Sequence, residues 1–471
     1  MEFEQGEALE PMSPSAQYLK SSVLSLTILG ILESEVPIDD SVTMPLVKDV
    51  FLPINHRFSS IMVSEKRGAK KWKRVEVNLN DHVEMPVFPT GRSTDYYDEV
   101  FNDYLSKLAM EQFPPNRPLW EIHIFKYPTK NAAGNVIFKL HHSLGDGYSL
   151  MGALLSCLQR VDNPSIQLTF PSRRSNLQHN RNSHGFCQRV PRFFSGFINT
   201  AYDFVWNVLK SSLIKDDKSP IRSGDDGVEF RPIAITTTTF SIDHIKQIKD
   251  KLKVTLNDVI TGIIIFGNRL YMQKVNEDSR KAKCTALVLL NTRATVGYKS
   301  VSEMIKPNAE MPWGNRFAFL QVPIPKLTAS DLNNPLKFVK KAQQLIKRQR
   351  NSASVYLTGQ FLDAIRKIRG PEATARCIRN TLKNSSMGIS NMIGPVEQMA
   401  IANQPVKGLY FAVVGAPQNL SVTVMSYVGK LRICMGVEKG FIDPDTFKSC
   451  LEYALEAISK AAIESPPQTK L

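Results

Sequence analysis

Two adjacent histidines, followed closely by an aspartate, are the residues of this sequence best suited to chemistry. They lie in the segment HHSLGDG, from His141 to Gly147. A neutral imidazole accepts a proton near neutral pH, because the ordinary pKa of histidine is about 6.5. Such a base could take the proton of a hydroxyl group while its oxygen attacks a thioester carbonyl, and a well-placed base accelerates a reaction by roughly 10²–10⁴-fold. The segment therefore predicts general-base chemistry.

The residues before the doublet predict the strand that must position it. Side chains alternate along a strand, so His142 shares one face with Leu140 and the apolar positions before it in Val136–His142. His141 then points to the opposite face. The chain turns after His142, and Tyr148–Arg160 has helical spacing of its leucines. Sheet-based folds place ligand sites at strand ends, so we predict His142 as the catalytic residue.

Asp146 and Gly147 are predicted to support this motif. Asp146 could cap the following helix, or pair with a basic residue to fix the loop that aims His142. Arg293, just after the predicted strand Ala286–Leu290, is one candidate partner. His141 and Asp146 also match H-x-x-x-x-D, the signature of glycerolipid acyltransferases, in which both groups act at the site. Sequence alone leaves this alternative open.

Other catalytic patterns are missing from the sequence. There is no G-x-S-x-G nucleophile elbow, Walker-A loop, H-E-x-x-H pair or dinucleotide G-x-G-x-x-G. The 6 cysteines form no C-x-x-C pair, so we expect neither a disulfide scaffold nor a metal site. Without an evident nucleophile, direct transfer is favoured over a covalent acyl-enzyme.

Length and composition indicate a two-domain α/β protein. The chain has 471 residues, of which 42% are hydrophobic and 22% charged, with short strand-like runs alternating with helical patterns. The formal net charge of +15 suits an anionic partner, such as an acidic membrane surface or coenzyme A. We expect no nucleic-acid partner, because no recognised module appears and the basic residues are spread. The predicted parts are an N-terminal domain (1–170), a basic linker (171–230) and a C-terminal domain (231–471).

The linker contains a helical segment, Phe193–Leu213, with polar residues at every fourth position. Its 21 residues would be about 32 Å long as a helix, enough to cross a bilayer. Asp203 near the centre opposes this, because a carboxylate there costs about 2.5–3.5 kcal/mol. A helix lying in the membrane interface and a surface helix packed on the second domain are equally good predictions, and a spanning helix ranks third.

The wider set of motifs resembles one known family. HHSLGDG matches the HHxxxDG element of the bifunctional wax ester synthase/diacylglycerol acyltransferases, and the whole chain looks like the plant branch. The further elements of this resemblance, in chain order, are Pro118-Leu119-Trp120, Asn257-Asp258, Gly314-Asn315, Ser390-Asn391-Met392-Ile393-Gly394-Pro395 and Ser426-Tyr427. The D-F-G-W-G element of the related plant acyltransferases of secondary metabolism is missing from this sequence.

The resemblance implies a fold, a reaction and substrates. The fold would be that of coenzyme A-dependent acyltransferases related to chloramphenicol acetyltransferase, with a tunnel between two α/β domains. Acyl-CoA would enter as co-substrate from one end, and a fatty alcohol or diacylglycerol from the other, with no bound cofactor. His142 would be the proton acceptor. The competing hypothesis is a non-catalytic membrane lipid-binding protein, but this hypothesis leaves the HHSLGDG motif unexplained.

Polar residues of the later motifs are candidate substrate or oxyanion contacts. These are Asn257, Ser390 and Asn391. Thr255 is expected to be the N-cap of a helix that Asp258 helps to cap, and Trp120 is expected to lie in the core. The N-terminus lacks a basic region followed by an apolar run, so we expect no secretion signal. Free thiols and an interfacial helix favour the cytosolic face of the endoplasmic reticulum membrane, with the plasma membrane as a second location.

Overall fold

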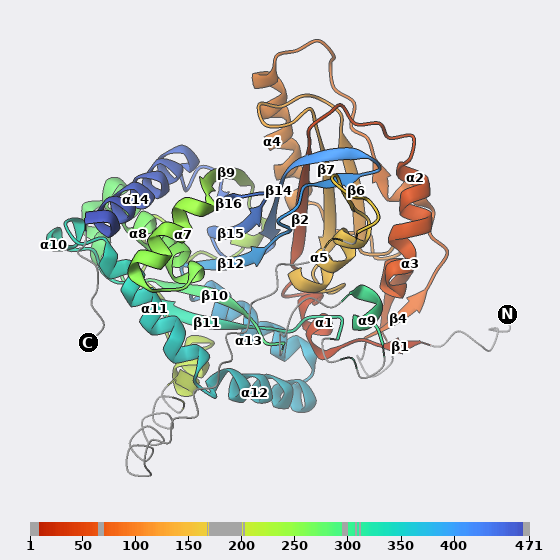
Figure 1. Ribbon diagram of the computed structural model, residues 1–471. Coiled ribbons are helices and arrows are strands. Elements are labelled where there is room, and N and C mark those ends of the chain that lie inside the picture. The colour runs from red at the N-terminus through yellow and green to blue at the C-terminus, as the bar shows by residue number, and fades with distance from the viewer. Residues whose placement is uncertain are drawn as a thin grey trace, which may run out of the picture.

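The protein folds into two α/β lobes, each built on its own sheet (Figure 1). The computed structural model describes residues 9–64, 70–166, 168, 200, 203–293, 300–306, 309 and 312–464. Residues 171–199 of the predicted linker (171–230) lie outside the described residues. The α/β class expected from the alternating pattern is confirmed.

The first lobe contains a seven-stranded sheet whose fourth and fifth strands come from opposite halves of the chain. Its order is β5 (Val83–Glu84), β6 (Trp120–Phe125), β7 (Gly134–His141), β2 (Thr27–Ser34), β14 (Gln404–Val414), β13 (Met399–Ile401) and β8 (Gln159–Arg160). β14 pairs with β2 along eight residues, although the two strands are far apart in sequence. The predicted domain bounds, 1–170 and 231–471, do not anticipate that β14 joins the first sheet. Through β14, the second half of the chain pairs with the sheet that carries the histidines.

Helices cover both faces of this sheet, and the alternation of β7 decides which side chains meet them. Ile137 packs in a cluster with α4 (Thr94–Met110). Phe138 and Leu140 belong to the opposite cluster, together with residues of α5 (Gly147–Ser156). The predicted faces of the strand are therefore confirmed, and His142, two positions after Leu140, continues the face that carries α5.

The second lobe contains a six-stranded sheet. Its order is β11 (Phe317–Pro323), β10 (Thr285–Asn291), β12 (Met387–Ile393), β15 (Leu420–Tyr427), β16 (Lys430–Glu438) and β9 (Ile233–Ser241). The helices that share its largest apolar cluster are α7 (Ile242–Leu252), α8 (Leu256–Val275), α11 (Leu336–Arg350) and α14 (Pro444–Glu464). On the other face, α13 (Pro371–Lys383) and α1 (Pro14–Leu19) pack around Leu287.

Short elements complete the described chain. A three-stranded sheet joins β1 (Glu10–Pro11), β4 (Lys70–Arg74) and β3 (Ser60–Ser64). The remaining helical pieces are α2 (Thr43–Leu46), η1 (Val47–Phe51), α3 (Leu52–Ile54), η2 (His56–Ser59), η3 (Leu79–Asp81), η5 (Val228–Phe230), η6 (Glu277–Lys281), α9 (Val301–Met304), α10 (Ala329–Leu332) and α12 (Ser354–Arg369). Among them, η1 is a π-helical segment that continues α2.

Capping residues set the start of the buried helix α8, as predicted. Thr255 accepts a hydrogen bond from the backbone of Asp258, and the Asp258 carboxylate accepts one from the backbone of Thr255. This reciprocal pair satisfies two amide groups that a helix start leaves unpaired. Further along the chain, α11 and α12 are separated at residues 351–353.

The described part of Phe193–Leu213 is a helix over residues 203–210 that packs on the second lobe. The Asp203 carboxylate pairs with Arg348 at 2.6 Å, and Asn207 donates a hydrogen bond to Thr358. Its polar stripe thus contacts protein, as in the surface-helix prediction. None of the described helices combines the length and the apolar character needed to cross a membrane. Residues 193–199 and 201–202 lie outside the described residues.

Candidate active site

The HHSLGDG segment forms the connection between β7 and α5. β7 ends at His141, and the amide of His142 still donates a hydrogen bond to Leu26 O. Asp146 is the N-cap of α5, because its Oδ1 accepts a hydrogen bond from the Ser149 amide at 3.1 Å. The strand end therefore holds the backbone on one side of the loop, and the helix start holds it on the other.

The His142 imidazole is oriented by Asn315, which lies two residues before β11. Nδ1 of His142 lies 2.9 Å from Asn315 Oδ1, while Asn315 Nδ2 donates to the His142 carbonyl at 2.9 Å. Because the Asn315 amide nitrogen donates to the His142 carbonyl, it is the Asn315 amide oxygen that faces Nδ1. This oxygen can only accept a hydrogen bond. Nδ1 must then carry the proton, and Nε2 keeps its lone pair. This is the tautomer that a general base at Nε2 needs.

Burial keeps this imidazole neutral. The side chain of His142 is 5% exposed and lies 5.4 Å, ring to ring, from Phe317. Burial lowers the pKa of His142 below its ordinary value, since an apolar environment disfavours the charged imidazolium, while the nearby Asp146 carboxylate partly opposes this effect. The His142 imidazole is therefore neutral and held in one orientation.

His141 has a different environment. It is fully buried, and its Nδ1 accepts a hydrogen bond from the Ser143 amide at 3.0 Å. Its Nε2 lies 3.0 Å from the Ser25 hydroxyl. Both ring nitrogens are therefore engaged in structural bonds, and burial holds the pKa of His141 well below its ordinary value. The pairing of His141 with Asp146, which the glycerolipid acyltransferase alternative needs, is not among these contacts.

Asp146 pairs with Arg293, as the sequence predicted. The guanidinium of Arg293 contacts both carboxylate oxygens, at 2.6 Å and 3.1 Å, and Asp146 also accepts the Arg316 amide at 2.8 Å. The two side chains are almost entirely buried. A bidentate pair of this kind fixes geometry, and removing one partner of a buried pair typically costs about 3–5 kcal/mol.

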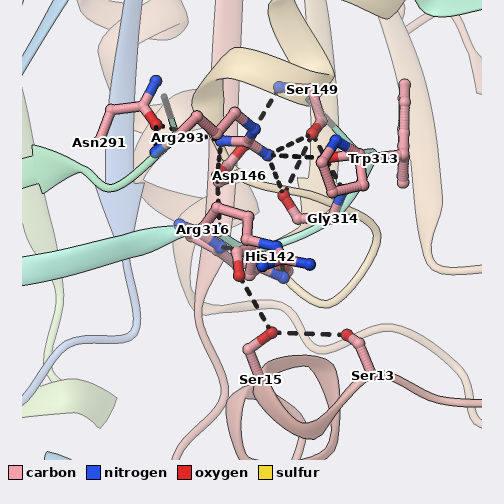
Figure 2. Close-up of polar contacts among 12 residues, drawn as sticks. Ser13, Ser15, His142, Asp146, Ser149, Asn291, Arg293, Trp313, Gly314 and Arg316 are labelled. Atoms are coloured by element: carbon pink, nitrogen blue, oxygen red, sulfur yellow. Dashed lines mark hydrogen bonds and ion pairs between the residues drawn. The ribbon is translucent and has the colours of Figure 1, made fainter. Parts of the chain in front are cut away.

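Residues 312–316 join the two lobes at the site (Figure 2). Arg293 donates to Gly314 O at 2.7 Å, and the Trp313 indole donates to Leu144 O at 2.7 Å. Asn315, which faces His142, belongs to the same segment. The segment comes from the C-terminal half of the chain, so the orientation of His142 depends on contact between the lobes.

The candidate contacts Asn257 and Asn391 meet at the start of α8. Asn391 Nδ2 donates to Asn257 Oδ1 at 3.0 Å. Asn391 and Ser390 both lie in β12, and both are half-buried. Among the described residues, no hydrogen bond links this pair to His142. Trp120 is fully buried and donates to Phe58 O, so its prediction as a core residue is confirmed.

An apolar pocket lies on the His142 face of β7, at the boundary between the lobes. Leu140 and Gly147, which flank the histidine in sequence, line it together with Met392 of β12. His142 itself does not line the pocket. A Cβ atom at Gly147 would overlap the Met392 sulfur, so a larger residue there would displace the Met392 side chain. Among the described residues, no group of three or more His, Cys, Asp or Glu could hold a metal ion.

Two family models match the chain. Residues 53–260 match the wax ester synthase/diacylglycerol acyltransferase catalytic domain, and residues 313–459 match the WS/DGAT C-terminal domain. The chain belongs to the wax ester synthase/diacylglycerol acyltransferase family. Members of this family are acyl-CoA-dependent O-acyltransferases, and that activity is accordingly assigned to this chain.

Curated relatives agree with the family, and a solved structure shows the same fold. Wax ester synthase/diacylglycerol acyltransferase 11 of Arabidopsis thaliana is 28% identical, over 97% of this chain and 96% of the relative. Wax ester synthase/diacylglycerol acyltransferase 6 of the same plant is 29% identical, over 98% and 95%. The Marinobacter aquaeolei VT8 wax ester synthase/diacylglycerol acyltransferase has the same fold, with a TM-score of 0.58 and 15% identity over 96% of this chain and 99% of that one.

A second solved structure extends the likeness of fold. The starter condensation domain of rhizomide synthetase, in complex with C8-CoA, matches with a TM-score of 0.55 and 10% identity, over 98% of this chain and 96% of that one. The predicted fold, that of coenzyme A-dependent acyltransferases related to chloramphenicol acetyltransferase, is therefore confirmed.

Proposed function

We propose that this protein transfers a long-chain acyl group from acyl-CoA to the hydroxyl of a fatty alcohol or diacylglycerol, with His142 as general base. The observation that carries the proposal is the hydrogen bond from His142 Nδ1 to Asn315, which leaves the Nε2 lone pair available. No hydrogen bond to Nε2 is found among the described residues. A base with one nitrogen held and the other unoccupied is preorganised for proton transfer.

The reaction then needs no covalent intermediate. Nε2 accepts the hydroxyl proton as the alcohol oxygen forms a bond to the thioester carbonyl carbon. The tetrahedral intermediate collapses by breaking the carbon–sulfur bond, and the imidazolium returns its proton to the thiolate of coenzyme A. The products are an ester and free coenzyme A. Acyl-CoA thus serves as co-substrate, and no step requires a bound cofactor.

Arg293 and Asp146 act through the loop and not on the reacting atoms. Their ion pair holds the start of α5 against residues 312–316, the segment that also supplies Asn315. The Asn257–Asn391 pair and Ser390 are proposed as substrate or oxyanion contacts, because amide and hydroxyl donors stabilise a developing oxyanion. Asn391 donates to Asn257, which leaves the Asn257 amide nitrogen directed elsewhere.

A membrane surface is the proposed place of action, on the cytosolic face of the endoplasmic reticulum. Supporting it, apolar side chains are exposed on and beside α12: Val205, Leu213, Tyr356 and Ile368. The last turn of α12 is basic, which favours anionic headgroups. Binding to vesicles with anionic phospholipid should exceed binding to neutral vesicles, and Ile368→Glu should reduce it; equal binding by the two proteins would contradict this placement.

The function is tested by offering purified protein palmitoyl-CoA with hexadecanol or with diacylglycerol, and detecting both the ester and free coenzyme A. We expect one ester per coenzyme A released. Palmitoyl-CoA alone should release no stoichiometric burst of coenzyme A, because no acyl-enzyme forms. A protein that binds these lipids but forms no ester with either acceptor would support the non-catalytic reading instead.

A further inference from the structure

A second apolar pocket continues the first one away from His142. The proximal pocket is the apolar space described above, and Leu140 and Phe138 of β7 both line it. The distal pocket is lined by Phe138 and Val136 of the same strand face, together with Val47 of η1. Positions 140, 138 and 136 are successive side chains on one face, so the two pockets lie in series along β7.

The two pockets together have the length of a long hydrocarbon chain. From His142 to Val136 the strand advances six residues, or about 20 Å at 3.3 Å per residue. The distal pocket also contains Asp39 and Gln404 in its wall. The Asp39 amide donates to the Gln404 side chain at 3.0 Å, and the Gln404 amide donates back to Asp39 O at 2.8 Å. These bonds place polar atoms at one border of an otherwise apolar space.

Two aromatic rings separate the pockets. Phe51 and Phe138 line both spaces, and their ring centroids lie 6.5 Å apart. Phe138 is fixed on β7, an interior strand of the sheet. Phe51 ends the π-helical segment η1, where the Leu52 amide donates to Val47 O across five residues. Such wider turns are rare and occur frequently at functional sites.

We propose that the Phe51–Phe138 pair is a gate that sets the length of the hydrocarbon chain accepted by the enzyme. The chain would fill the proximal pocket first and reach the distal pocket by displacing the Phe51 ring. The ligand is a linear hydrocarbon chain, which either the acyl donor or the alcohol acceptor supplies. This inference rests on the proposed function, because the chain must start beside His142.

The expected effects follow from apolar burial. Each methylene that loses an apolar environment costs about fourfold in kcat/KM, which corresponds to about 0.8 kcal/mol. Val47→Phe should fill the distal pocket, so kcat/KM for a C16 chain relative to C8 should fall at least tenfold. Cys157→Met fills the same pocket from another wall and gives a second, milder variant. Phe51→Leu should move the preference towards longer chains.

A matched control removes the same kind of ring from the other face of the sheet. Phe125 is fully buried in β6, within the cluster that packs on α4 and not in either pocket. Phe125→Leu should therefore lower stability without changing the C16 to C8 ratio. If Phe125→Leu changed the C16 to C8 ratio of kcat/KM as much as Phe51→Leu does, loss of packing, and not the gate, would explain the change.

The experiment measures kcat/KM in two series. In the first, acyl-CoA length varies from C8 to C20 with hexadecanol fixed; in the second, alcohol length varies with palmitoyl-CoA fixed. A shift confined to the first series assigns the pockets to the acyl chain, and one confined to the second assigns them to the acceptor. Unchanged ratios in both series, with an active wild type, would overturn the gate and leave the proposed function standing. A wild type that forms no ester would remove both.

Discussion

Replacing Asn315 tests how the structure prepares the catalytic base. Asn315→Ala removes the acceptor that holds His142 Nδ1 at 2.9 Å and the donor to the His142 carbonyl. The ring then loses the contact that selects its tautomer, while the strand and helix on either side of the loop keep their own bonds. We therefore expect a loss of turnover without a loss of fold.

The size of the loss follows from the charge that develops on the ring. When Nε2 accepts the alcohol proton, the imidazole becomes an imidazolium, and its bond to Asn315 becomes a bond from a charged donor. Such bonds contribute about 1.5–3 kcal/mol, against about 1 kcal/mol for neutral partners. The neutral bond is already present before the reaction, so only the difference, about 0.5–2 kcal/mol, affects kcat. Since about 1.4 kcal/mol corresponds to tenfold in rate, kcat should fall about two- to thirtyfold.

Asn315→Asp adds a test through pH. Burial lowers the pKa of His142, so the wild-type base is neutral at pH 7 and loses activity only below that pKa. A carboxylate beside Nδ1 favours the imidazolium and raises this pKa. The acid limb of kcat/KM, measured from pH 5 to 8.5, should therefore move to higher pH.

Ser15→Ala provides the control for both variants. The Ser15 hydroxyl donates to the backbone carbonyl of Asn315 at 3.3 Å, so this bond does not involve the Asn315 side chain. This variant should keep kcat within about twofold, since a neutral, half-buried bond contributes little. If Asn315→Ala retained wild-type kcat and Asn315→Asp left the acid limb in place, the orientation of His142 by Asn315 would be refuted.

Three further variants address the surrounding structure. Arg293→Leu leaves the buried Asp146 carboxylate unpaired and should cost about 3–5 kcal/mol in urea unfolding; a change below 1 kcal/mol would contradict the role of the pair. Gly147→Ala should displace Met392 and lower kcat/KM for palmitoyl-CoA, and adding Met392→Ala should restore part of it; no recovery would place the fault elsewhere. Thr255→Ala should lower stability by about 1 kcal/mol through loss of the helix cap, and an unchanged unfolding midpoint would disprove it.

Local patterns predicted much of the site. The alternation of Val136–His142 placed the two histidines on opposite faces, and the structure gives them opposite environments. Arg293 was one candidate partner of Asp146, and the structure pairs the two side chains. Thr255 and Asp258 formed the predicted cap, since capping depends on residues only three positions apart.

Contacts that depend on distant chain segments were not predictable in this way. Asn315 lies 173 positions from His142, and the Gly314-Asn315 motif was its only signal in the sequence. No periodic pattern in the sequence indicates that β14 joins the first sheet. The same is true of the π-helical turn that carries Phe51. Both arise from packing between elements, which a single sequence does not encode locally.

The most direct measurement compares turnover of palmitoyl-CoA and hexadecanol by His142→Ala and His141→Ala. We predict that His142→Ala loses about 10²–10⁴-fold in kcat while its unfolding transition stays close to that of the wild type. His141→Ala should be less stable, because it loses the bonds to Ser25 and Ser143, yet its folded fraction should still form ester. Normal turnover by His142→Ala, or loss of turnover only in folded His141→Ala, would contradict the assignment of His142 as the base.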